Sequence, residues 1–130
     1  METGLVKLNP ELMAMISGRD AATSIAPFQR EVFLVKLPVK GTGYCKRIKK
    51  EQRGLVPGME LTLRRHPDNE YDDCAVGIYS GDRRVGWVPM VHNQIIAHLM
   101  DIGKRFICKI DSIVHDDDWP KIEVNIYIVD

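Results

Sequence analysis

The sequence has few cysteines and no long hydrophobic segment. Its three cysteines, Cys45, Cys74 and Cys108, form no C-x-x-C pair, so they predict reduced, mostly buried thiols rather than a disulfide framework. No run approaches the roughly 20 apolar residues of a membrane-spanning helix, and we expect no membrane partner. The first residues lack the basic and apolar parts of a signal peptide. We therefore expect a cytoplasmic protein, associated with the nucleoid if it is bacterial.

Signatures of catalysis and of metal binding are also missing. The sequence contains no G-x-S-x-G, no Walker loop and no H-E-x-x-H. One cluster matches no zinc or calcium spacing and is typical of a turn; it comprises His66, Asp68, Asp72 and Cys74. Residues 116–118 are three aspartates without the glycine and terminal glutamate of a calcium loop. We expect no catalytic residue, no metal and no cofactor, and hence no enzyme.

The chain divides into a short N-terminal segment and one domain. Its 130 residues are 45% hydrophobic and 28% charged, which is typical of a single globular domain. Within residues 1–29, Asn9 and Pro10 predict the start of a short helix that ends at Gly18, followed by a linker. Residues 30–130 predict the folded domain.

Apolar patterns predict about six strands in this domain. A run that is apolar on both faces, from Val32 to Val39, predicts a central strand. Alternating patterns predict the other strands, which lie around 59–65, 74–78, 83–88, 106–110 and 122–128. Ser80-Gly81-Asp82 predicts a hairpin turn, and residues 41–57 read as a loop. The expected fold is mainly β: a small antiparallel OB-like barrel with one helix after the central hairpin.

The helix after the hairpin has the clearest pattern in the chain. Pro89 begins it and Gly103 ends it. We expect a buried stripe of Ile95, Ile96, Leu99 and Met100, with His92, Asn93, Gln94 and Asp101 facing water.

The zero net charge conceals a polarised chain. Residues 36–65 contain nine basic and two acidic residues, a net charge of +7, and the remainder of the chain carries −7. Five of the basic residues follow Tyr44 closely: Lys46, Arg47, Lys49, Lys50 and Arg53. Such a run is either a solvated loop or a phosphate-binding loop. An adjacent tyrosine favours the second interpretation, because single-strand sites combine cationic grooves with stacking aromatics.

One stretch of the sequence is specific enough to resemble a known family. Residues 58–78 follow the pattern G-x-x-L-x-L-x-R-x-P-x-N-x-Y-D-x-x-A-V-x-I, and a hairpin then leads to Gly86-Trp87-Val88-Pro89 and the helix. This order resembles the HIRAN domain, a module of certain Snf-type DNA-remodelling helicases that also occurs alone in bacteria. The resemblance covers about residues 31–114.

The resemblance implies an OB-like barrel that binds single-stranded DNA, preferentially at a free 3′ end, in a repair or replication-fork context. By position, the aromatic residues that hold terminal bases are Tyr44 and Tyr71, and Asp72 engages the 3′-hydroxyl. A carboxylate there would accept a bond from a hydroxyl and repel a continuing phosphate. Implied partners are single-stranded DNA or DNA 3′ ends and a helicase or other repair protein.

The sequence departs from this pattern at several positions of the implied site. Cys45 replaces a second aromatic residue, and Gly43 and Met90 occupy positions that can carry cations. Trp87 replaces a phosphate-contacting histidine; it packs or stacks a base. Glu70 replaces a common proline. These losses leave two alternatives open: a protein-interaction module without DNA-end binding and, more weakly, a DNA- or nucleotide-processing hydrolase.

Overall fold

The computed structural model describes residues 30–45, 47–116 and 118–130, so the helix predicted between Asn9 and Gly18 lies outside the described residues. The folded body runs from Glu31 to Asp130. Its elements, in chain order, are β1 (Glu31–Pro38), η1 (Thr42–Tyr44), α3 (Ile48–Glu51), η2 (Gln52–Gly54), β2 (Glu60–Arg65), β3 (Val76–Ser80), β4 (Arg83–Trp87), α4 (Met90–Asp101), β5 (Arg105–Val114) and β6 (Lys121–Val129).

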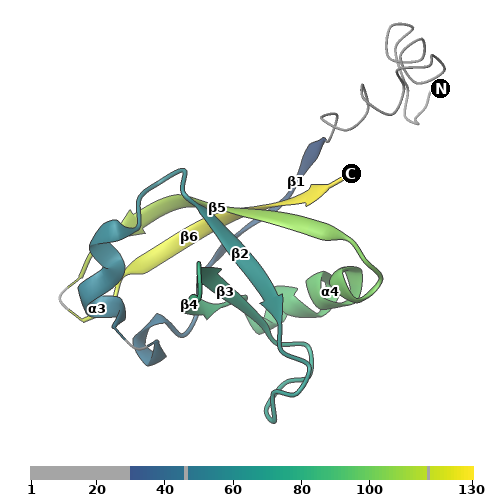
Figure 1. The fold of residues 1–130 in the computed structure, drawn as a ribbon, viewed down its shortest axis with the longest axis horizontal. Helices are drawn as coiled ribbons and strands as arrows, with labels where there is room; N and C mark the ends of the chain where they lie inside the picture. The colour runs from purple at the N-terminus through teal and green to yellow at the C-terminus, as the bar shows by residue number, and fades with distance from the viewer. Residues whose placement is uncertain (1–29, 46, 117) are drawn as a thin grey trace, which may run out of the picture. The chain divides into compact units, whose positions relative to one another are not determined.

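The six strands form one antiparallel sheet in the order β1-β6-β5-β2-β3-β4 (Figure 1). This arrangement confirms the mainly β, OB-like prediction, but the sheet does not close into a full barrel. Within the described residues one isolated bridge joins Lys40, two residues after the edge strand β1, to Trp87 of the other edge strand, β4. There the Lys40 amide donates to the Trp87 carbonyl at 2.9 Å, and the Trp87 amide donates to the Lys40 carbonyl at 2.7 Å.

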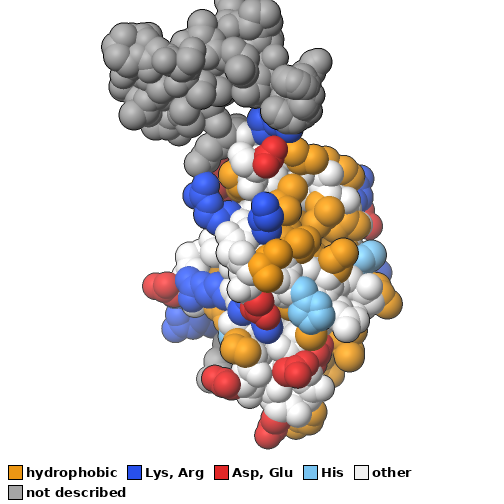
Figure 2. Space-filling model, turned by 90° about the vertical axis from the view of Figure 1, so that its right-hand side faces the viewer, with side chains coloured by type: hydrophobic (Ala, Val, Ile, Leu, Met, Phe, Trp, Pro, Cys, Tyr) orange, Lys and Arg blue, Asp and Glu red, His pale blue; other side chains and the backbone are white. Residues whose placement is uncertain are grey.

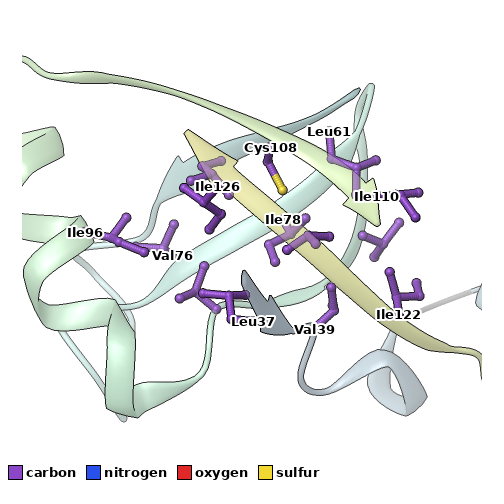
Figure 3. Packing of buried hydrophobic residues seen from close by; sticks show 14 of the residues in the cluster. Leu37, Val39, Leu61, Val76, Ile78, Ile96, Cys108, Ile110, Ile122 and Ile126 are labelled. Atoms are coloured by element: carbon purple, nitrogen blue, oxygen red, sulfur yellow. The ribbon is translucent and has the colours of Figure 1, made fainter. Parts of the chain in front are cut away.

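The core lies between the curved strands and the inner face of α4. Figure 3 shows Leu37, Ile78, Cys108 and Ile126 converging from four strands, with Ile96 of α4 pointing toward Val76 of β3. All six side chains are at most 1% exposed. Burying a side chain of this size contributes about 1.5–3 kcal/mol, so this cluster holds the hairpin and the helix to the long β5–β6 pair.

The prediction that the first strand is central was wrong. β1 is an edge strand that pairs only with β6 among the described strands. Its first apolar residues are exposed, Phe33 to 54%, whereas Leu37 near its end is buried. A run that is apolar on both faces is typical of a strand covered on both sides, but no element of the described body covers the start of β1.

The predicted buried face of α4 was partly wrong as well. The helix buries Asn93, Ile96 and Ala97, while Ile95 is 61% exposed. The reason is a polar contact that sequence periodicity does not report: the Asn93 side-chain amide donates to the Asp72 carboxylate at 2.6 Å. That bond satisfies the buried amide and turns Asn93, rather than Ile95, toward the body.

The segment predicted as a loop, residues 41–57, contains the short helices η1, α3 and η2. Ile48, Gln52 and Leu55 are buried. The Gln52 side chain donates to the carbonyl of Asp116 at 2.8 Å and accepts from its amide at 3.2 Å. This pair of bonds ties the basic segment to the turn between β5 and β6.

All three cysteines are free; Cys45 and Cys108 are buried and Cys74 is half-buried, as predicted. Burial raises the pKa of the Cys108 thiol to about 12, so it stays protonated at neutral pH. None of the helices in the described part of the chain has the length and apolar character needed to span a membrane.

Candidate nucleic-acid interface

Tyr44 stands on a turn whose neighbours hold it in place. The turn begins at Gly41, whose φ of 73° lies in the left-handed region. Thr42 and Cys45 are buried, and the Thr42 hydroxyl donates to the carbonyl of Pro120 at 3.2 Å. Tyr44 between them is 87% exposed. The fold therefore anchors the backbone on both sides of a solvent-facing aromatic ring.

One side of Tyr44 borders a hollow of about 830 Å³, the Tyr44–Trp119 hollow. Trp119, which is 50% exposed, also lines this hollow. Gly43 lies so close beneath this indole that an added Cβ would sit 3.1 Å from it. Lys40, Lys121 and Glu123 also line the hollow, so its charged lining residues have a net charge of +1. Two exposed aromatic rings and two lysines around one hollow can stack bases and contact phosphates.

Trp119 was missed in the sequence analysis. It follows the aspartates of the β5–β6 turn and precedes the alternating pattern of β6. The sequence does contain a signal for it, because Trp119 is an aromatic residue in a turn that belongs to no strand or helix pattern of apolar residues. Its proximity to Gly43, 76 positions earlier in the chain, is a property of the fold alone.

A second hollow, of about 590 Å³, lies beside Trp87 and the start of α4. Met90, Val91 and His92 line it, and Pro38 and Lys40 line both this Trp87 hollow and the Tyr44–Trp119 hollow. The two hollows therefore adjoin at Lys40.

Trp87 itself is held by packing. The His66 ring meets the indole edge-on with centroids 4.9 Å apart, and the Arg84 guanidinium lies 4.6 Å from the indole centroid. Gly41 approaches so closely that a Cβ there would lie 3.0 Å from the indole. His66 also bonds the Tyr79 hydroxyl at 2.7 Å. Burial, and then the charge of Arg84, lowers the pKa of His66, so this histidine is neutral at pH 7 and acts as a structural support.

Tyr71 and Asp72 lie on the loop between β2 and β3. The Asn69 side-chain oxygen accepts from the amides of Tyr71 and Asp72 at 2.9 and 3.0 Å. The Asp72 carboxylate accepts from the Cys74 amide at 2.9 Å and from Asn93 of α4 at 2.6 Å. Tyr71 is 87% exposed. Each Asp72 oxygen keeps a lone pair, so a fixed carboxylate stands beside an exposed ring.

The predicted site residues are only partly brought together. Tyr44 and Arg47 line one hollow. Tyr71 and Asp72 do not line either hollow bordered by Tyr44. Their connection to this surface is indirect: Asp72 binds Asn93, whose neighbour His92 lines the Trp87 hollow.

The members of the basic run that the structure describes also lie at different places on the surface. Lys49 and Arg53 line a hollow of about 640 Å³ beside Asp116, and Lys49 pairs with Asp118 at 3.8 Å. Lys50 is exposed, and Lys46 lies outside the described residues. Arg47 alone among the described members of the run lies beside Tyr44.

Comparison with known proteins identifies the family. The family model of the HIRAN domain matches residues 32–129, a range that includes residues of all six strands. The chain belongs to the HIRAN-domain family. Among solved structures, a protein from Lactobacillus plantarum is 25% identical and has a TM-score of 0.73; the match covers 79% of this chain and 99% of that one. The HIRAN domain of human HLTF is 16% identical with a TM-score of 0.59, covering 76% and 78%. No curated protein matches the chain.

The match to the HIRAN family includes every candidate residue described above and begins one residue after the start of β1. Within the described residues of this HIRAN domain, one group of three potential metal ligands is clustered: Asp72, Asp73 and Cys74, whose ligand atoms lie within 4.8 Å of one another. Partial burial and the charge of Asp73 raise the pKa of the Cys74 thiol. Asp72 is already bonded to Cys74 and Asn93, so the cluster is explained as the framework of the loop.

Proposed function

We propose that this HIRAN domain binds single-stranded DNA across the surface that Tyr44, Trp119 and Lys40 form. Membership of the family supports a nucleic-acid-binding role and the function of a binding module. The observation that carries the proposal is the exposed Tyr44 ring on an anchored turn, which lines one hollow together with Trp119, Lys40 and Lys121. Stacking on aromatic rings holds bases of any identity, at about 1–3 kcal/mol per base.

The same proposal extends to the 3′ end of the strand. Tyr71 offers a second exposed ring, and the adjacent Asp72 carboxylate is fixed by two hydrogen bonds. A terminal 3′-hydroxyl can donate to that carboxylate, whereas a 3′-phosphate would meet its negative charge. End selection by Asp72 is the finer part of the proposed function.

Fluorescence polarisation with a 5′-labelled oligothymidine ten nucleotides long tests both parts. At low salt we expect the full chain to bind it, and Tyr44→Ala to weaken binding by about 5- to 150-fold, the equivalent of one stacked base. Tyr44→Phe keeps the ring and should bind as the unmodified chain does. Absence of binding by the unmodified chain would refute the proposal.

The end-recognition part has its own test. The oligonucleotide with a 3′-hydroxyl should outcompete the same sequence with a 3′-phosphate, and Asp72→Asn should remove this preference. Asp68→Asn is the matched control, since Asp68 is an exposed aspartate of the same loop. Equal competition by both oligonucleotides would eliminate Asp72 as the selector while leaving strand binding in place.

A second candidate function is interaction with an apolar segment of a partner protein. Val91, Ile95 and Ile102 are all more than half exposed and recur at helical spacing along α4 and its end. Figure 2 shows hydrophobic side chains gathered on the face of the body that includes α4. A chain that binds no oligonucleotide at low salt, together with loss of a partner on Ile95→Glu, would favour this function over DNA binding.

A further inference from the structure

The other side of Tyr44 borders a smaller hollow whose walls are largely cationic. This arginine hollow has a volume of about 360 Å³ and is lined by Tyr44, Cys45, Arg47, Arg83 and Arg84. Arg47 precedes α3, whereas Arg83 and Arg84 begin β4. The three guanidinium groups come from segments 36 positions apart in the chain, and the fold brings them to one place beside the exposed ring.

Most of the positive charge at this hollow is not neutralised by the protein. Arg83 forms an ion pair with Glu51. In the described ranges, by contrast, no carboxylate pairs with Arg47 or Arg84. Two uncompensated arginines in one small hollow repel each other, and an anion placed between them removes that repulsion.

Arg84 has in addition an unused hydrogen-bond donor. Its Nε is buried and has no hydrogen-bond partner within the described part of the chain. The guanidinium is held over the Trp87 ring and lies near the Cys45 thiol. A buried N–H without a partner is unfavourable, so the protein leaves part of the hydrogen-bonding capacity of Arg84 unused.

The arginine hollow also has the right position for a strand bound at Tyr44. Tyr44 lines this hollow on one side and the Tyr44–Trp119 hollow on the other. A nucleotide whose base stacks on Tyr44 therefore places its backbone within reach of one or both hollows. Gly43 lines the Tyr44–Trp119 hollow and Met90 lines the Trp87 hollow, and neither residue carries a charge. Among these three hollows, the guanidinium donors are all at the arginine hollow.

We propose that Arg47, Arg83 and Arg84 form a phosphate-binding subsite that holds the backbone phosphodiester next to the base stacked on Tyr44. This inference rests on the proposed function and assigns the strand a path over the start of β4. Tetrahedral phosphate oxygens match the paired donors of a guanidinium group, and the three arginines supply such donors from two segments of the chain.

Salt dependence of DNA binding tests the subsite. With the labelled oligothymidine, each phosphate contact contributes about 0.7 to the slope of log K against log salt. We expect Arg47→Gln and Arg84→Gln each to lower that slope by about 0.7 and to weaken binding at low salt. Arg105→Gln, an exposed arginine at the start of β5, is the matched control and should leave the slope unchanged.

An oligonucleotide series locates the phosphate along the strand. A neutral methylphosphonate placed at one linkage at a time should weaken binding by the unmodified chain at one position above all others. With the methylphosphonate at that position, Arg84→Gln should bind the oligonucleotide as tightly as the unmodified chain does, because the charge that the arginine meets has already been removed. The assignment would be overturned if the methylphosphonate lowered the affinity of Arg84→Gln by the same factor as it lowers the affinity of the unmodified chain.

The outcomes separate this inference from the function on which it rests. If the unmodified chain binds DNA but both arginine variants match Arg105→Gln in affinity and slope, the subsite is refuted and DNA binding stands. If Arg84→Gln fails to fold, exposed Arg47 carries the test alone. In nuclear magnetic resonance spectra the Arg84 Nε–H signal should shift on adding oligonucleotide. A shift with inorganic phosphate but none with the oligonucleotide would identify a free-anion site and overturn the proposal.

Discussion

Arg47 offers a test in which stability and DNA binding are expected to change in opposite directions. It has φ of 66° and is the only residue other than glycine with a positive φ among the described residues. Its side chain is exposed and lines the arginine hollow. The residue therefore adopts a backbone conformation that suits glycine, at a position where the proposed subsite needs a cation.

The effect on stability follows from the backbone. The left-handed conformation costs a residue with a Cβ about 1–2 kcal/mol, whereas glycine loses about 0.5–1 kcal/mol more chain entropy on folding. Arg47→Gly should therefore raise the free energy of unfolding by up to about 1 kcal/mol. Arg47→Ala keeps the Cβ and the strain, so its stability should stay close to that of the unmodified chain.

The effect on binding is the same in both variants. Each removes one guanidinium group, so both should weaken oligonucleotide binding to the same extent and lower the salt slope by about 0.7. Urea denaturation gives the stability difference between the glycine and alanine variants, and fluorescence polarisation gives the affinity. A glycine variant less stable than the alanine variant would refute the strain argument. Affinity unchanged in both would refute the role of Arg47 in the subsite.

Three further predictions concern the framework that positions the site. Ile96→Ala should lower the free energy of unfolding in urea by about 2–5 kcal/mol, because Ile96 is fully buried; Ile95→Ala on the exposed face should change it by less than about 1 kcal/mol, and equal losses would contradict the observed face of α4. Gly86→Ala should destabilise more than an exposed Gly→Ala change such as Gly54→Ala, since the new Cβ would collide with Val39 and lie 2.7 Å from the Lys40 carbonyl; an equal melting temperature for the two variants would refute this. The Arg65 guanidinium, 2.9 Å from Asp101, holds the pKa of that carboxyl below its usual 3.8, so the pair stabilises the fold above that pH and the contribution disappears as pH falls through the lowered pKa. Melting curves of the unmodified chain and Asp101→Asn should therefore differ at pH 7 and converge in strong acid; a constant difference would exclude the ion pair as the cause.

Local patterns predicted the strands well because alternation reports which face of a strand is buried. In β6, for example, Ile122, Val124 and Ile126 are at most 2% exposed, as their spacing implies. The turn at Gly81 was also predictable, because its φ of 62° is a conformation that glycine adopts at little cost. The helix after the hairpin was found with its start within one residue, at Met90.

The same patterns failed where the burial of a side chain depended on its neighbours in space rather than along the chain. The apolar start of β1 is as hydrophobic as a central strand, yet Phe33 is exposed because β1 is at the edge of the sheet. On α4, Ile95 fits the apolar stripe better than Asn93, but the bond from Asn93 to Asp72 determines which face is buried. Hydropathy records the preference of a side chain for burial, whereas sheet order and hydrogen-bond partners decide whether burial occurs.

The sequence by itself determined the strand pattern, the polarised charge, and the resemblance, carried by residues 58–89, that the match over residues 32–129 confirmed. These features depend on residues that are close together along the chain, so the periodicity and the spacing of motifs in the sequence report them directly. Only the tertiary structure decided that Trp119 and Tyr44 line one hollow, and that Arg47 lines another with Arg83 and Arg84. It also decided that Lys49 pairs with Asp118 and that Tyr71 lines neither of the hollows that Tyr44 borders. Such contacts join residues tens of positions apart, and the packing of the curved sheet against α4 and the short helices determines them.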